Sequence, residues 1–143
     1  MKLFTIGYEG KRIDEVLVQL SRAGVSLLID VRAVAASRRP GFSKTALAAA
    51  LRERGISYLH LRALGTPKAG REAARKGRVA EMRAIYAGQL ETPEAQLALE
   101  QTRSAASQNR SALLCFEVEA ASCHRAVIAE RLAASDGFDL VDL

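Results

Sequence analysis

The sequence predicts a single α/β domain in three layers, with helices on both faces of a mainly parallel, Rossmann-like sheet of about five strands. Short apolar runs alternate with longer amphipathic segments along the whole chain, which is the pattern of repeated strand and helix units. The run at residues 25–32 is apolar on both faces, as is typical of a strand buried between helical layers. With 143 residues, 49% of them hydrophobic, the chain suits one core, so we expect one domain over residues 1–143.

The first half of the chain predicts three strands separated by two helices. The first helical segment places its apolar residues on one face and stops at Gly24. The second begins with Ser43 as a candidate N-cap and ends at Gly55, a residue suited to a helix terminus. In order, we expect a strand at 2–7, a helix at 12–24, a strand at 25–32, a helix at 43–55 and a strand at 56–61.

The second half predicts a long helical region followed by a strand, a helix and a short final strand. Residues 71–108 are rich in Ala, Arg and Glu, and Thr92 with Pro93 forms a helix-start signal within them. Between this region and the third strand, residues 61–70 offer little to bury, so we expect a mobile loop. The last elements expected are a strand at 111–117, a helix at 122–135 capped by Ser122, and a strand at 138–143.

Composition excludes several classes of protein. No window approaches the ~20 consecutive apolar residues of a membrane span, and the N-terminal residues do not resemble a signal peptide, so we expect a cytoplasmic protein. Two cysteines are too few for a disulfide framework. The glycine patterns that bind dinucleotides or ATP phosphates are absent, so we expect no NAD, ATP or other cofactor.

Positive charge is concentrated in the middle of the chain. The formal net charge is +5, and 13 of the 21 Lys and Arg residues lie between Arg32 and Arg83, with three acidic residues among them. Clustered cations favour a polyanionic partner, here a nucleic acid or a phosphorylated nucleotide. The alternative is an ordinary solvated helix face. The charge pattern does not indicate an oligomeric state.

Polar residues follow the predicted strands where each strand ends. In open parallel sheets, ligands bind at the carboxyl ends of the strands, so these residues are candidates for one site. Along the chain they are Gly7, Tyr8, Glu9 and Gly10, then Asp30 and Arg32, then His60, and then Glu117. The start of the last long helix adds Cys123, His124 and Arg125 at the same edge.

Several short motifs occur in a fixed order over almost the whole chain. They are TIGYEG, IDVR followed by Ser37 and Arg38, FSK, GISYLHLRALG, LLCFE and CHR. Together they closely resemble the family numbered 488 among the domains of unknown function, DUF488. The family usually has a proline where this chain has Ala35, so we expect a less rigid loop there. Some members of the family are similar to DNA-base glycosidases, and the resemblance implies that this activity is a candidate.

The carboxylates at the strand ends suit that chemistry. Glu117 and Glu9 can act as acid, base or nucleophile at a glycosidic bond, because burial or a neighbouring Arg tunes a carboxyl pKa. Asp30 is a third candidate, although pairing with Arg32 or Arg38 to fix the loop is the alternative. Tyr8 can stack on a base or donate a hydrogen bond.

Other residues are candidates for holding phosphate or base. Gly7 and Gly10 permit a close backbone approach of a ligand. A basic cluster with one interleaved aromatic can hold backbone phosphates and stack on a base. Arg125 can bind a phosphate at the helix terminus or neutralise Asp30 or Glu117. The cluster consists of Arg38, Arg39, Lys44 and Phe42, and the resembling motif adds Arg32 and Ser37.

The cysteines leave a second hypothesis open. Cys123 in a first helical turn, beside His124 and Arg125, is in a setting that lowers a thiol pKa, although it can equally be a packing residue. Cys115 and Cys123 with one adjacent His match no common zinc spacing, so we expect no metal.

Three functions therefore remain. The leading hypothesis is an enzyme that hydrolyses an N-glycosidic bond of a modified base in a nucleic acid or nucleotide. The alternatives are a thiol enzyme that depends on Cys123, with His124, and a noncatalytic nucleic-acid-binding module. The sequence does not separate the first from the third, because both need the same basic surface.

Overall fold

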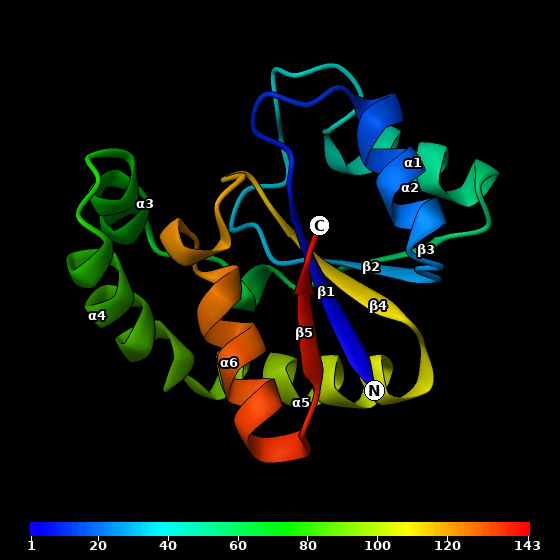
Figure 1. The fold of residues 1–143 in the computed structure, drawn as a ribbon. Coiled ribbons are helices and arrows are strands. Elements are labelled where there is room, and N and C mark those ends of the chain that lie inside the picture. Colours follow the sequence, from blue (N-terminus) through cyan, green and yellow to red (C-terminus); the bar gives the residue numbers. More distant parts are fainter.

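A computed structural model describes all 143 residues and confirms the predicted fold class. Five strands form one sheet in the order β3-β2-β4-β1-β5, and every neighbouring pair is parallel (Figure 1). The strands are β1 (Lys2–Gly7), β2 (Leu27–Asp30), β3 (Ser57–His60), β4 (Ser111–Cys115) and β5 (Asp139–Asp142). All carboxyl ends therefore lie at one edge of the sheet.

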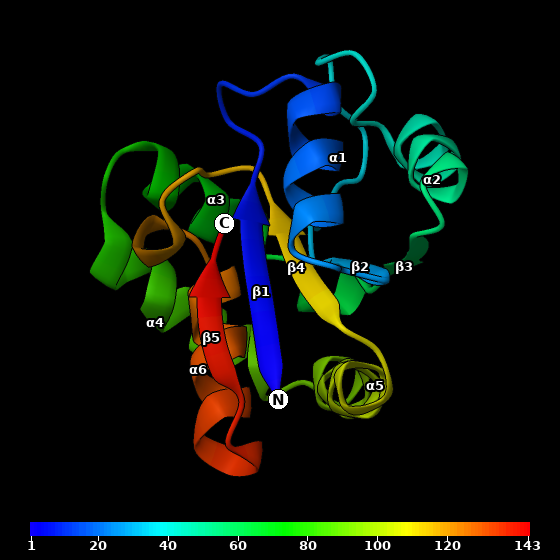
Figure 2. The ribbon, with the colours of Figure 1, turned by 45° about the vertical axis from the view of Figure 1, so that its right-hand side comes forward.

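Helices cover both faces of the sheet, which gives three layers. Helices α1 and α2 lie on one face, and the other face carries α5 and α6, with α3 and α4 beside them (Figures 1 and 2). The helices are α1 (Ile13–Arg22), α2 (Lys44–Glu53), α3 (Lys68–Arg75), α4 (Val79–Leu90), α5 (Pro93–Gln108) and α6 (Arg125–Asp136). None of them combines the length and the hydrophobicity that a membrane crossing requires.

Each face of the sheet has its own apolar core. Along β4, Leu113 packs into the core under α4, α5 and α6, while Leu114 packs into the core under α1 and α2. All five residues of β4 are buried, as expected for a central strand that is covered on both faces. Complete burial of such a leucine stabilises the fold by about 1.5–3 kcal/mol.

The long helical region divides into three helices rather than two. The expected start of α5 is confirmed, since the Thr92 side chain accepts a hydrogen bond from the Ala95 amide and Pro93 is the first helical residue. An additional break separates α3 from α4 at Gly77, whose φ of +74° ends the first helix. A single glycine within a helical pattern gave too weak a signal to predict this break.

The expectation that residues 61–70 have little to bury is wrong. A short 3₁₀ helix, η1 (Arg62–Leu64), lies in this segment, and the side chain of Leu64 is completely buried. The Tyr86 hydroxyl donates a 2.6 Å hydrogen bond to the Leu64 carbonyl. Gly65 packs so closely on Ala33 that a Cβ atom would collide with it. The segment is thus an integral part of the core.

The last long helix begins later than expected. Residues Ala120–Ser122 form a second 3₁₀ helix, η2, and α6 starts at Arg125 with His124 at the N-cap position. Ser122 is therefore not the helix cap, and Cys123 lies in extended backbone before the helix. This one change of backbone conformation alters the surroundings of both cysteines.

Candidate functional site

A pocket of about 240 Å³ opens at the carboxyl edge of the sheet. Tyr8, Arg32 and Phe116, which follow β1, β2 and β4, contribute to its walls together with residues of α3 and α4. Most ligand pockets measure ~300–1,000 Å³, so this pocket fits one small ring or a small anion. The lining includes the side chains of Tyr8, Arg32, Arg71, Arg75, Met82, Cys115, Phe116, Glu117 and His124.

Glu117 is the predicted carboxylate that lines this pocket. It follows β4, and one of its carboxylate oxygens lies 3.5 Å from the Cys115 sulfur. Apolar and aromatic groups, including Phe116 and Met82, line the same pocket. The arrangement supplies one carboxylate beside a largely apolar cavity, which is a setting suited to acid-base chemistry.

Three other candidates hold the backbone at Glu117 and do not line the pocket. Arg125, which is 0% exposed, donates from its guanidinium to the Glu117 and Val118 carbonyls. Glu9 accepts a 3.3 Å hydrogen bond from the Val118 amide. At Gly7 a Cβ atom would collide with the Glu117 carbonyl, so the glycine admits protein backbone there rather than a ligand.

Arg125 has neither of the expected roles. It pairs with no carboxylate, and its Nε atom is buried without a hydrogen-bond partner. Burial lowers the pKa of the neighbouring Lys11, and the charge of Arg125 lowers it further. The guanidinium thus acts on main-chain carbonyls and fixes the turn after β4.

Asp30 is committed to a buried network and does not reach the pocket. Its oxygens accept hydrogen bonds from Arg32 Nε at 2.9 Å and Nη2 at 2.7 Å, and from the Tyr58 hydroxyl at 2.6 Å. Burial opposes the charge of Arg32, but the bonds to Asp30 raise its pKa above the usual value. Burial and the bond to Asp30 also raise the pKa of Tyr58. The network fixes the end of β2. Asp30 therefore has the structural role that was the alternative to catalysis.

The aromatic residues are arranged differently from the prediction. Tyr8 and Phe42 stack on each other, with ring centroids 4.3 Å apart, and Phe42 is only 1% exposed, so it has no free face for a base. Phe116 is 41% exposed, lines the pocket and meets Tyr8 edge-on. Phe116 was missed by the sequence reasoning, although it directly precedes Glu117.

The basic residues Arg38, Arg39 and Lys44, between Ser37 and the start of α2, do not line the pocket either. Ser37 donates its amide to the Ser43 hydroxyl at 3.0 Å, and its carbonyl accepts a bond from the same hydroxyl. Ser43 is therefore occupied with closing the loop and makes no side-chain cap bond to α2. Arg38 is exposed on the loop between β2 and α2, and Lys44 is exposed as the first residue of α2. Gly10, with φ of +73°, serves a tight turn after β1.

Two arginines of α3 supply positive charge at the pocket, where the sequence had predicted the basic cluster around Phe42. Arg71 and Arg75 line the pocket. Arg71 Nη1 donates a 2.9 Å hydrogen bond to the Thr66 carbonyl, whereas Arg75 is exposed. Both belong to the basic stretch of the sequence, but no local signal distinguished them from their neighbours.

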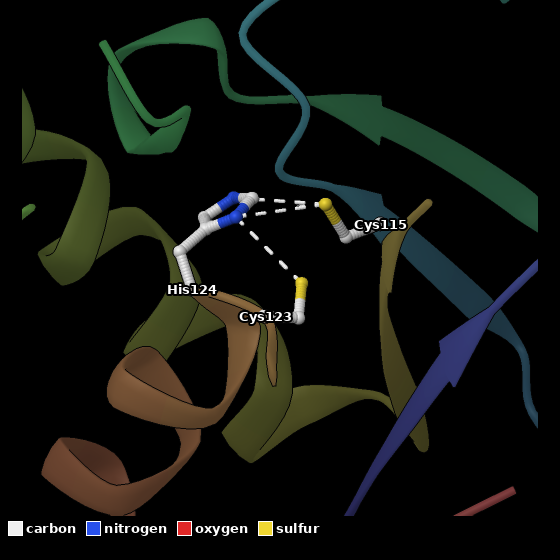
Figure 3. Close-up of side chains that lie close together, drawn as sticks. All are labelled: Cys115, Cys123 and His124. Carbon is white, nitrogen blue, oxygen red and sulfur yellow. Dashed lines mark hydrogen bonds between the residues drawn. The ribbon is translucent and has the colours of Figure 1, made fainter. Parts of the chain in front are cut away.

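The side chains of Cys115, Cys123 and His124 come together (Figure 3). The His124 Nδ1 atom lies 3.5 Å from the Cys115 sulfur and 3.7 Å from the Cys123 sulfur. Cys115 and His124 line the pocket, whereas Cys123 is 1% exposed. Burial raises the pKa of the Cys123 thiol well above its usual value, opposite to the expected lowering. The other histidine, His60, is not part of this cluster and bonds to the Arg32 carbonyl at 2.8 Å.

Comparison with known proteins gives one match. The family model described as "Domain of unknown function DUF488" matches residues 12–132, which include Cys115, Glu117 and His124. No curated protein and no solved structure matches the chain.

Proposed function

The chain belongs to the DUF488 family, and on this premise we propose that it is an enzyme of nucleic acids or nucleotides that hydrolyses the N-glycosidic bond of a modified base. The observation that carries the proposal is the position of Glu117 at the pocket. Of the three candidate carboxylates, Asp30 is saturated by Arg32 and Tyr58, and Glu9 bonds to the backbone outside the pocket. Glu117 is the carboxylate left to act on a bound ligand.

The proposed hydrolysis requires one general base, which is Glu117, and one cavity that holds the leaving nucleobase. Glu117 takes a proton from water, the water oxygen forms a bond to the sugar carbon, and the bond from that carbon to the base nitrogen breaks. The nucleobase leaves with the bonding electron pair and takes up the proton that Glu117 removed from water, which restores the carboxylate. A carboxylate beside the reacting carbon also stabilises the positive charge that develops on the sugar.

The walls of the pocket support a planar substrate. Phe116 offers an exposed aromatic face, and Tyr8 packs edge-on behind it. Aromatic stacking contributes about 1–3 kcal/mol per base. With a volume of about 240 Å³, the pocket accepts one base, so a base within a duplex has to be flipped out of the stack first. The guanidinium groups of Arg71 and Arg75 supply the cations for adjacent phosphates.

Two observations bear on the alternatives. Thiol catalysis by Cys123 loses support, because that sulfur is buried and its thiol pKa is raised. Both cysteines are free thiols, which suits the reducing cytoplasm as the place of action. A noncatalytic nucleic-acid-binding module would use the same cations. Only the detection of a reaction product distinguishes this hypothesis from the enzyme.

The test is release of free base from oligonucleotides that carry a panel of modified bases, with abasic sites as the second readout. The Glu117→Gln variant should release no base while its melting temperature stays nearly unchanged. The matched control is Glu119→Gln, because Glu119 is exposed, lies two residues away and does not line the pocket. An active Glu117→Gln variant would refute the assignment. Binding that weakens steeply with salt, without any product, would favour the noncatalytic module.

A further inference from the structure

The cluster of Cys115, Cys123 and His124 has the chemistry and the dimensions of a metal site. One ligating atom from each residue lies within 4.8 Å of the other two, and all three residues are buried. Two thiolates and one imidazole are the donors that Zn²⁺ takes in proteins. Bond lengths of about 2.3 Å to sulfur and 2.0–2.1 Å to nitrogen place neighbouring ligands of a tetrahedral ion about 3.6 Å apart. The two observed sulfur to Nδ1 distances, 3.5 and 3.7 Å, match this value.

The histidine is oriented as a metal ligand. Its Nε2 atom lies 2.7 Å from the Val31 carbonyl, and since a carbonyl only accepts, Nε2 carries the proton. In the neutral ring the Nδ1 atom then presents its lone pair to the two sulfurs (Figure 3). A second hydrogen bond of this kind commonly fixes the ring of a metal-bound histidine. Tyr86 packs edge-on against the ring, with centroids 5.0 Å apart, and restricts its rotation.

The fourth position of such an ion faces the pocket. Cys115 and His124 line the pocket, while Cys123 is almost completely buried and does not line it. Glu117 is outside the three-residue group, but its carboxylate lies 3.5 Å from the Cys115 sulfur. Three protein ligands with an open fourth position are typical of catalytic rather than structural zinc. A carboxylate that lies beside a Cys₂His site, without binding the metal itself, is suited to transfer protons to and from metal-bound water.

We propose that Cys115, Cys123 and His124 bind one Zn²⁺ ion, with the fourth position open to water or substrate in the pocket. Binding forms two metal–sulfur bonds and one metal–nitrogen bond and releases the two thiol protons. The two thiolates balance the charge of the ion, so the buried site is neutral overall. No oxidant or other reactant is needed. The inference does not rest on the glycosidic activity, since it concerns the binding of the metal alone.

The test is metal content and cobalt spectroscopy on the full chain. Protein purified without chelators should contain about one Zn²⁺ per chain by mass spectrometry of metals. After removal of the metal, added Co²⁺ should give the strong visible bands of a tetrahedral ion and a sulfur-to-cobalt charge-transfer band. Cys123→Ala and His124→Gln should each lose most of the bound metal. His60→Gln and Glu117→Gln should keep it, because neither His60 nor Glu117 belongs to the site.

Other outcomes overturn the proposal. A chain that takes up neither Zn²⁺ nor Co²⁺ while circular dichroism shows it folded has only a hydrogen-bonded thiol and imidazole cluster. A mass lower by two hydrogens, without metal, identifies a disulfide between the cysteines. Metal that stays on a folded Cys115→Ala, Cys123→Ala double variant is bound elsewhere. If the metal is present but no base is released, the metal site stands and the glycosidase assignment fails.

Discussion

Asp30 and Arg32 form a bidentate ion pair at the end of β2, with nitrogen to oxygen distances of 2.9 and 2.7 Å. The two side chains come from positions only two residues apart, and both are nearly inaccessible to solvent. The same Arg32 also donates to the Tyr8 hydroxyl and to the Phe42 carbonyl. The pair therefore connects the end of β2 to the segments at Tyr8 and Phe42.

Asp30→Asn should destabilise the protein by about 3–5 kcal/mol, because it leaves the buried guanidinium of Arg32 without a counter-charge. Urea denaturation measures the loss. The matched control is Asp14→Asn, whose partner Arg12 and own side chain are both exposed, and there the loss should stay below about 1 kcal/mol. Equal midpoints for the two variants would show that the buried pair does not stabilise the fold.

Gly7→Ala should reduce activity more than it reduces binding of an oligonucleotide. The new Cβ atom collides with the Glu117 carbonyl, so the turn after β4 has to shift and carries the Glu117 carboxylate with it. Single-turnover rates and equilibrium binding separate the two effects. Gly88→Ala is the control, because nothing lies within 4 Å of a Cβ atom there. Unchanged rates in Gly7→Ala would mean that the turn moves without displacing the Glu117 carboxylate.

Arg75→Ala should weaken nucleic-acid binding and lower the slope of log affinity against log salt by about one, the effect of one lost phosphate contact. Its guanidinium is exposed at the pocket, so the melting temperature should change little. Arg38→Ala provides the comparison, because Arg38 is exposed on the loop away from the pocket. A larger loss in Arg38→Ala would place the binding surface on the loop between β2 and α2 instead.

Tyr58→Phe should lose more stability at neutral pH than at strongly alkaline pH. The raised pKa of Tyr58 means that its phenol adds stability below about pH 10, the usual tyrosine pKa, and loses it as the pH rises toward the folded-state pKa. Denaturation midpoints of both proteins at about pH 8 and about pH 11 test this, and the gap between them should narrow at the higher pH. A constant gap would show that the tyrosine proton is not coupled to folding.

The sequence predicted all five strands because apolar periodicity depends only on neighbouring residues. The sequence also placed Glu117 at the carboxyl edge of the sheet, since residues that end parallel strands meet at one edge. The position of Phe42 was misjudged, because the same apolar side chain can pack in a core or face a ligand. Arg71 and Arg75 were not singled out, since helical periodicity does not tell which face of a basic helix meets a pocket.

The cysteine and histidine cluster was beyond sequence reasoning for a different reason. Spacing rules for metal sites describe a few recurring backbone shapes. Here the chain leaves β4 at Cys115, turns through η2 and brings Cys123 and His124 back beside it. Two features hold the segment between Cys115 and Cys123 in place. They are the hydrogen bonds from Arg125 to the Glu117 and Val118 carbonyls and the tight contact at Gly7. Such long-range support has no signature in the local sequence.

The hydrogen bond from His124 to the Val31 carbonyl ties the floor of the pocket to the sheet. We therefore expect the floor to be less mobile than the rim. The Val31 amide bonds in turn to the Leu114 carbonyl, and the Tyr8 amide bonds to the Cys115 carbonyl, so the floor is joined to the three central strands. Backbone amides there should be among the slowest to exchange with solvent. Entry and exit of a ligand must then depend on the rim, where Phe116 and the exposed Arg75 have the freedom to move. We therefore expect a few surface side chains to set the rate at which a ligand enters and leaves, while Cys115 and His124 below them keep their geometry.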